Sequence, residues 1–218
     1  MTVSECAKLL GSKDSFLLLT HKNPDGDTVM SAAALCRALR RKNKRAYLYP
    51  NPDIITRMRP WAEKLFAPAS FQPQFIVSVD VATPSLFAHG FDGNVDLCID
   101  HHGTNSHFAA YELIDSSRSS CGEIVLEIIK VMNGKLTKTE ATLLYIALTT
   151  DTGAFQYANV NEASFTAAAE LLRYGADAPN VMMHFFRKAT LSRINVRKEE
   201  KGETTRVVVG MATCGIAA

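Results

Sequence analysis

The sequence has little that would place the protein in an oxidising compartment or a membrane. Its five cysteines are odd in number and widely spaced, with no C-x-x-C pair: Cys6, Cys36, Cys98, Cys121 and Cys214. This pattern fits neither a disulfide framework nor a zinc ribbon, and it favours a cytoplasmic setting. No run approaches the ~18 apolar residues of a membrane span, so we expect neither export nor membrane embedding.

The sequence also lacks an excess of charge of either sign. Lys and Arg number 24, and Asp and Glu number 22, which gives a formal net charge of +2. Such a balance provides no broad basic field that would gather long nucleic acids, so any phosphate recognition must be local. Internal repeats and low-complexity tracts are absent too, and 47% apolar residues suffice for a real core. We therefore expect a globular chain.

Strand and helix patterns alternate along the sequence. Short apolar runs predict strands at 16–20, 46–49, 75–79 and 95–99. Helical spacing predicts helices at 2–10, 28–41, 120–131, 137–148, 159–174 and 179–186. Capping-box spacing occurs at 2–5, 120–123 and 137–140, and Asp27 can cap the helix of 28–41. Because such alternation demands crossover connections, we predict an α/β fold with a doubly wound, mainly parallel sheet and helices on both faces.

Acids and histidines follow the ends of several predicted elements. They are His21, Asp25 and Asp27 after the first strand, Asp80 after the third, Asp100, His101 and His102 after the fourth, and Asp151 after the helix of 137–148. In an open α/β sheet, ligands bind outside the carboxyl ends of the strands, so these side chains can converge on one crevice. We expect His21, Asp80 and Asp100 at that edge.

So many acids close together would resist burial unless cations neutralised them. The set contains no cysteine, which argues against structural zinc, and mixed carboxylates and imidazoles suit Mn²⁺, with Mg²⁺ or Co²⁺ as weaker candidates. The acids exceed the needs of one ion, and two ions form the usual arrangement for in-line attack on phosphorus. We therefore interpret the chain as a metal-dependent phosphoesterase.

The sequence resembles the DHH phosphoesterase family. Between about residues 16 and 191 it contains the four ordered motifs His21-x-x-Pro24-Asp25-Gly26-Asp27, Asp80, Asp100-His101-His102-x-x-Asn105 and Thr150-Asp151-Thr152-Gly153-x-Phe155. Within the family it is most similar to the bifunctional oligoribonuclease and pAp phosphatase (nanoRNase) group. The resemblance implies that metal-activated water hydrolyses short oligoribonucleotides or pAp.

The resemblance also implies individual roles. The metal ligands would be His21 and Asp25 on one Mn²⁺, Asp27 and His101 on the other, Asp80 as the bridge, and Asp151 to complete the cluster. Two further residues would act in catalysis. His102 would face the scissile phosphate or leaving oxygen, and Asp100 would orient the neighbouring imidazoles.

Two features depart from the family pattern. Met30-Ser31 replaces a small Gly-Ser pair after the first motif. The chain also stops at Ala218, whereas relatives continue into a C-terminal substrate-binding domain. We therefore expect a DHH catalytic domain at 1–188, and a linker with the truncated start of that second domain, including a strand at 205–210, at 189–218.

Two other functions stay open. A family II inorganic pyrophosphatase would share the cluster, although Gly26 favours the oligonucleotide branch because pyrophosphatases usually place a threonine there. Alternatively, the chain is a nucleotide-binding module with impaired catalysis. We expect no long nucleic-acid partner and no membrane, and a homodimer is a further open alternative.

Overall fold

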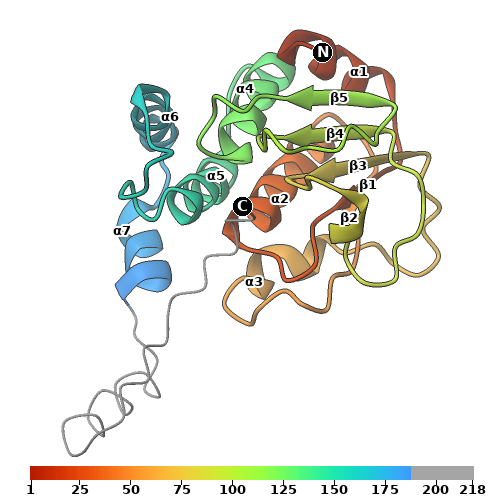
Figure 1. Ribbon diagram of the computed structural model, residues 1–218, viewed down its shortest axis with the longest axis horizontal. Coiled ribbons are helices and arrows are strands. Elements are labelled where there is room, and N and C mark those ends of the chain that lie inside the picture. The colour runs from red at the N-terminus through yellow and green to blue at the C-terminus, as the bar shows by residue number, and fades with distance from the viewer. Residues whose placement is uncertain (188–218) are drawn as a thin grey trace, which may run out of the picture.

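The computed structural model describes residues 1–187, so the linker and strand predicted within 189–218 lie outside the described residues. One sheet has the order β2-β1-β3-β4-β5, formed by β1 (Phe16–Leu19), β2 (Ala46–Leu48), β3 (Phe75–Val79), β4 (Leu97–Asp100) and β5 (Tyr111–Ile114) (Figure 1). Every neighbouring pair is parallel. The chain moves outward from β1 to β2 and then returns past β1 to β3. The doubly wound α/β fold is thus confirmed, and its switch point lies between β1 and β3.

The helices are α1 (Val3–Ser12), α2 (Gly26–Arg41), α3 (Arg59–Ala62), α4 (Cys121–Asn133), α5 (Lys138–Asp151), α6 (Glu162–Arg173) and α7 (Ala178–Val181), with 3₁₀ turns η1 (Glu63–Leu65) and η2 (Pro84–Leu86) and a π-helical segment η3 (Met182–Arg187). Helix α2 packs on β1 and β3, and α4 packs on β4. Helix α5 packs against both α2 and α4 (Figure 1). Among the described helices, none combines the length and apolarity that crossing a bilayer requires.

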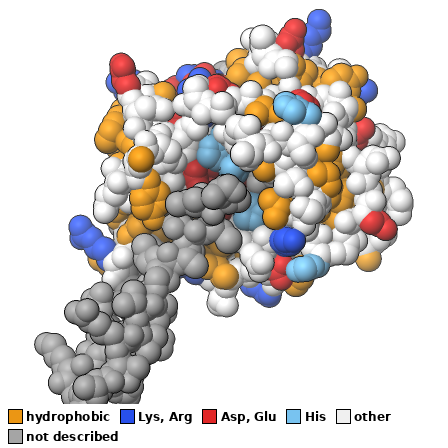
Figure 2. Space-filling model, viewed as in Figure 1, with side chains coloured by type: hydrophobic (Ala, Val, Ile, Leu, Met, Phe, Trp, Pro, Cys, Tyr) orange, Lys and Arg blue, Asp and Glu red, His pale blue; other side chains and the backbone are white. Residues whose placement is uncertain are grey.

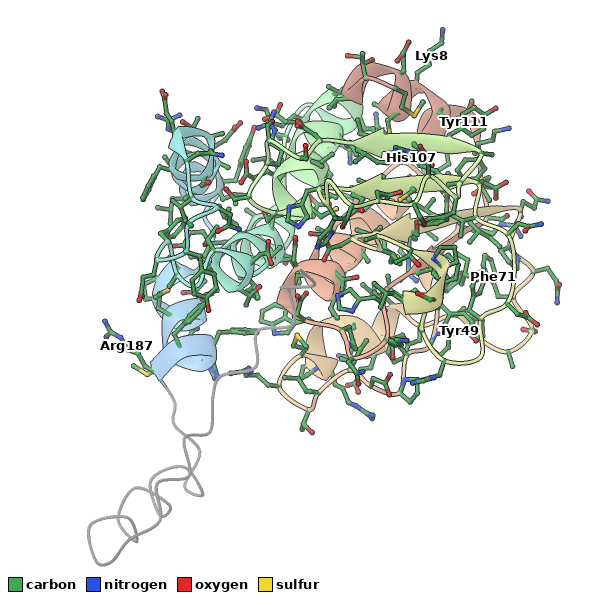
Figure 3. The ribbon with its side chains drawn as sticks, in the orientation of Figure 1. Lys8, Tyr49, Phe71, His107, Tyr111 and Arg187 are labelled. Carbon is green, nitrogen blue, oxygen red and sulfur yellow. The ribbon has the colours of Figure 1, made fainter. Side chains whose placement is uncertain are left out.

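The two faces of the sheet are covered differently. Phe16 and Leu18 join the main core beneath the helices, whereas Leu17 and Leu19 point to the other face, as successive strand residues must. Aromatic side chains from the long connections cover that second face, and Figure 3 labels Tyr49 and Phe71 among them. The long helices thus lie on one face, while connections with short helical turns close the other.

The sequence patterns missed β5 completely. This strand lies at the edge of the sheet and pairs only with β4. Tyr111 is exposed, and only Leu113 is buried, so the segment lacks the continuous apolar run that marks the inner strands. A short edge strand with a glutamate, Glu112, gives too weak a pattern to recognise in advance.

The predicted helix starts were partly wrong. The capping boxes of Thr2 and Thr137 are confirmed. Asp27 does not cap α2, because the helix begins at Gly26 and Asp25 accepts the backbone hydrogen bonds at its N-cap. The predicted capping box at Ser120 is absent as well, since the Ser120 hydroxyl makes no capping hydrogen bond.

Candidate metal centre

The structure brings the predicted site residues to one edge of the sheet. His21 follows β1, Asp80 follows β3, and His101 follows β4, while Asp25 caps the start of α2 and α5 ends at Asp151. Because all strands are parallel, their carboxyl ends meet at this edge, around the switch point. On the face shown in Figure 2, histidine and acidic side chains lie side by side.

The ligand atoms form three overlapping groups, within each of which all atoms lie within 4.8 Å of one another: His21, Asp25 and Asp80; Asp27, His101 and Asp151; and Asp80, His101 and His102. Asp80 belongs to two of these groups. The His101 Nε2 atom lies 3.4 Å from Asp80 Oδ1 and 3.5 Å from Asp151 Oδ2. The Asp80 carboxylate is therefore shared between the group that contains His21 and Asp25 and the group that contains His101 and His102.

The centre contains buried atoms that lack partners. Asp80 Oδ1 and His101 Nε2 are buried and have no hydrogen-bond partner among the described residues. Leaving a buried polar atom unpaired costs about 1–3 kcal/mol, so such atoms need a reason to persist. Both are of the types that Mn²⁺ and related cations bind. The donor set therefore fits divalent metal ions.

Asp80 also has an unusual backbone conformation. Its φ angle is 61°, in the left-handed region, which costs a non-glycine residue roughly 1–2 kcal/mol. The Asp80 N–H still donates to the Ile99 carbonyl, 2.8 Å away, and so holds the turn against β4. This turn follows the buried end of β3 and directs the Asp80 carboxylate into the centre.

Burial and mutual repulsion raise the pKa of several carboxyls. Burial raises the pKa of Asp80 well above its ordinary value, and the charges of Asp27 and Asp25 raise it further. Burial, followed by the same two charges, raises the pKa of Asp151 to about 8. Burial also raises the pKa of Asp27, although His101 opposes the change. Without metal, the cluster therefore holds protons near neutral pH that bound cations would displace.

Asp27 joins two helices. Its carboxylate accepts hydrogen bonds from the backbone N–H groups of Cys121 (2.6 Å) and Gly122 (3.0 Å) at the start of α4, and from the Ser31 hydroxyl (2.9 Å). Asp27 thus supplies from α2 the cap that Ser120 does not supply. These bonds fix the carboxylate in a fully buried position, and they explain why a serine follows the buried Met30.

Asp100 orients His102 but not the His101 ring. The fully buried Asp100 carboxylate contacts His102 Nδ1 at 2.8 Å and accepts from Asn105 Nδ2 at 2.6 Å and from the His101 backbone N–H. The Asp100 hydrogen bond raises the pKa of His102 even though burial opposes it. Since Nδ1 is engaged, the Nε2 atom of His102 remains free to face a substrate.

The His101 ring is held from the opposite side. Its Nδ1 atom lies 3.1 Å from the carbonyl oxygen of Arg118, which can only accept, so Nδ1 must carry the proton. The Nε2 atom, on the other side of the ring, consequently faces the carboxylates. The sequence did not indicate this contact, because a backbone carbonyl 17 positions away leaves no signal in the residue types.

Asn51 braces the loop that contains His21. The buried Asn51 side chain donates to the Thr20 hydroxyl and to the His21 carbonyl, each at 2.9 Å, and accepts from the Asp53 N–H. His21 in turn lies 3.7 Å from Asp25. Asn51 lies in the connection after β2, where no motif in the sequence marks it as a contact of the centre.

Comparison with known proteins identifies a family and several relatives of this chain. The model of the DHH family, N-terminal domain, matches residues 15–148. The chain is 35% identical over 164 residues to the bifunctional oligoribonuclease and PAP phosphatase NrnA of Thermus thermophilus, covering 72% of this chain and 49% of that protein. It is 24% identical to the protein of the same name from Bacillus subtilis, covering 89% and 63%. The chain thus spans about half to just under two thirds of the length of these relatives.

Two solved structures share the fold. An exopolyphosphatase-related protein of Bacteroides fragilis superposes with a TM-score of 0.76 at 22% identity, covering 90% of this chain and 63% of that one. A candidate family II inorganic pyrophosphatase of Methanococcus jannaschii gives 0.57 at 21% identity, covering 80% and 61%. At these identities the likeness shows the fold alone.

A parallel sheet that gathers carboxylates and imidazoles at its switch point defines an α/β domain with a candidate metal centre. The family match covers the strands and every predicted ligand except Asp151, which follows three residues later. The chain belongs to the DHH family, as the four motifs indicated.

Proposed function

We propose that this chain is the catalytic part of a two-metal phosphoesterase that hydrolyses short oligoribonucleotides or pAp. The observation that carries the proposal is the pair of buried, unpartnered atoms, Asp80 Oδ1 and His101 Nε2, at the centre of the acid cluster. Hydrogen bonds alone would leave them unsatisfied, whereas cations would satisfy both and offset the repulsion among the carboxylates.

The grouping of ligand atoms suggests how two ions would be held. His21 and Asp25 would hold one ion, Asp27, His101 and Asp151 would hold the other, and Asp80 would contact both. When bound, such ions supply a water of lowered pKa for attack on phosphorus and positive charge for the phosphoryl oxygens. The protein contributes by fixing these ligands before the ions arrive, through the capping bonds of Asp25 and Asp27.

His102 would move a proton rather than hold a metal. Its Nδ1 atom is engaged by Asp100, and its side chain is 39% exposed, so Nε2 can reach a substrate outside the ligand shell. From there, it can donate a proton to the leaving oxygen as a phosphate ester bond breaks. Asp100 would keep the ring oriented and stabilise its protonated form, while Asn105 holds Asp100 in place.

The substrate class is supported by the relatives. The Thermus thermophilus and Bacillus subtilis proteins are both named as oligoribonucleases and PAP phosphatases. A near-neutral chain of this kind suits short substrates, since it lacks a broad basic surface for long ones. Mn²⁺ is the preferred cation on its ligand types, with Mg²⁺ and Co²⁺ as alternatives.

One observation weighs against the pyrophosphatase alternative. A Cβ atom built on Gly26 would lie 2.4 Å from Thr150 Oγ1 and 2.6 Å from its Cγ2. A threonine at position 26, as the pyrophosphatase resemblance would require, therefore cannot fit beside Thr150 in this packing. The chain is built around a residue without a side chain at this point, as in the oligonucleotide branch.

The proposal is tested by presenting the chain with Mn²⁺ and four substrates: an activated phosphodiester, a ribonucleotide dimer, pAp and inorganic pyrophosphate. We expect hydrolysis of the first three, abolished by EDTA and restored by Mn²⁺. Cleavage of pyrophosphate alone would instead support the pyrophosphatase function. Nucleotide binding without turnover of any substrate would support the non-catalytic module.

A further inference from the structure

Two ligands of the centre come from different elements that are joined by polar contacts behind the ligand atoms. His101 extends from the end of β4, and Asp151 is the last residue of α5, yet their ligand atoms Nε2 and Oδ2 lie 3.5 Å apart. His101 is oriented by the Arg118 carbonyl, as described above. The spacing of these two ligands therefore depends on how the segment around 118–120 is fixed to the end of α5.

That connection is made by Ser119 and Asn159. The Asn159 amide nitrogen donates to the Ser119 carbonyl (3.0 Å) and to the Asp151 carbonyl (3.2 Å). Its two hydrogens can serve both acceptors at once. In the reverse direction, the Ser119 hydroxyl donates to the Asn159 carbonyl (2.7 Å) and also contacts the Ser164 hydroxyl of α6. Ser119 is fully buried.

The backbone after Asp151 is bent so that Asn159 can reach back. Gly153, Ala154 and Phe155 all have positive φ angles, of 56°, 56° and 64°. For the two non-glycine residues this conformation is unfavourable by roughly 1–2 kcal/mol each. Three successive left-handed residues reverse the chain directly behind the Asp151 carbonyl, which as a helix-terminal group has no partner within α5.

We propose that Ser119 and Asn159 are positioning residues that set the separation of His101 from Asp151 and thereby the affinity of the metal site they share. This inference rests on the proposed metal function. Ser119 holds the residue next to Arg118, whose carbonyl orients His101, and Asn159 holds the peptide of Asp151 itself. Neither residue belongs to the groups of candidate ligand atoms, so both would act through His101 and Asp151.

The test compares Ser119→Ala and Asn159→Asp with a matched control. Asn159→Asp keeps the size of the side chain but replaces the bridging donor with an acceptor, so both carbonyl contacts are lost. Thr142→Val serves as the control. The Thr142 hydroxyl also donates to a carbonyl, of Lys138, and accepts from a backbone N–H, of Asp177, but it lies in the first half of α5, away from the centre.

Two readouts are measured on the full chain: Mn²⁺ affinity by calorimetry, and the protonation pattern of the His101 ring nitrogens by NMR on the metal-free protein. We expect both positioning variants to bind the Mn²⁺ at the site shared by His101 and Asp151 about 10- to 100-fold less tightly. A loss of this size is typical when a hydrogen bond that orients a metal ligand is removed. In the wild-type chain, the hydrogen bond to the Arg118 carbonyl should give one His101 Nδ1–H signal. In both positioning variants this signal should weaken or shift, because the ring is no longer held in one orientation. Thr142→Val should leave both readouts unchanged while lowering the free energy of unfolding.

Wild-type Mn²⁺ affinity together with an unchanged His101 signal in both positioning variants would overturn the inference. An equal loss of affinity in Thr142→Val would overturn it too, because the effect would then be general destabilisation. A wild-type chain that binds no Mn²⁺ would refute the proposed function instead, and the His101 signal would still decide whether Ser119 and Asn159 position the ring.

Discussion

Gly26 offers a direct test of how closely the metal centre depends on helix packing. Built on Gly26, a Cβ atom would lie 2.4 Å, 2.6 Å and 2.9 Å from Oγ1, Cγ2 and Cβ of Thr150. Rotation of the threonine cannot relieve all three contacts, and its hydroxyl is already bonded to the Ile146 carbonyl at 2.8 Å. In Gly26→Ala, the start of α2 must therefore move away from the end of α5 by about 1 Å to restore ordinary contact.

This displacement would directly change the distances between the metal ligands. Asp25 and Asp27 flank Gly26 at the start of α2, and Asp151 directly follows Thr150. A misplacement of ~1 Å can cost about 10²-fold in rate, and overpacking typically costs 1–3 kcal/mol of stability. We therefore expect Gly26→Ala to lose roughly 10²-fold in kcat/KM and 1–3 kcal/mol in the free energy of unfolding.

Urea denaturation of the metal-free protein and Mn²⁺-dependent hydrolysis of an activated phosphodiester would measure both effects. Gly11→Ala is the matched control, because a Cβ on Gly11 of α1 meets nothing within 4 Å. It should leave activity unchanged and stabilise the chain, since alanine favours a helix over glycine by about 0.5–1 kcal/mol. In the double variant with Thr150→Ala, which removes the two nearest atoms, part of the loss should be recovered. If Gly26→Ala retained wild-type activity and stability, the close approach of α2 to α5 could not be what sets the ligand geometry.

Three further predictions concern the ligands themselves. Asp80→Ala should remove the shared ligand, so metal analysis should find fewer than two Mn²⁺ per chain and activity should fall at least ~10²-fold; unchanged stoichiometry would rule out the shared role. His102→Ala should keep both ions while slowing turnover, and loss of metal would instead make His102 a ligand. The metal-free chain should become less stable as pH rises from about 5 to 8. The pKa of Asp151 is raised to about 8 in the folded chain, so the stability that its protonated form provides is present at low pH and is lost as pH rises through that value, by up to ~1.4 kcal/mol per pH unit. A flat urea-stability profile in EDTA over this range would contradict it.

The strands that hold the centre were predictable because their sequences carry a strong local signal. β1 is a continuous apolar run and β3 is interrupted only by Ser78, and polar residues follow both, as expected for strands covered on both faces. From the alternation of these strands with helices, a parallel sheet and the convergence of His21, Asp80 and Asp100 on one edge follow by topology. The edge strand β5 did not follow, because a half-exposed strand contains no such run.

The contacts that orient the ligands could not be predicted in the same way. The Arg118 carbonyl, the Asn51 side chain and the Ser119 hydroxyl each act across long sequence separations, of 17 to 40 positions. Asparagine and serine, which supply two of these groups, are common in any loop. Local capping rules even misassigned Ser120, because a carboxylate from another helix, Asp27, had already taken its place. Local rules fail where a distant side chain competes for the same backbone groups.

The positions of the acids relative to the helices suggest how the cluster tolerates its own charge. Asp25 caps α2, and Asp27 lies at the N-terminus of α4, where unpaired N–H groups and the helix dipole favour a carboxylate. Despite burial, the nearby His21 imidazole and the hydrogen bonds from the α2 backbone keep the pKa of Asp25 below its ordinary value. Asp151 lies instead at the C-terminus of α5, where the dipole disfavours an anion. The centre therefore has one carboxylate, Asp25, that is ionised before metal arrives, and others, Asp80 and Asp151, that must lose a proton to bind, so metal affinity should rise with pH.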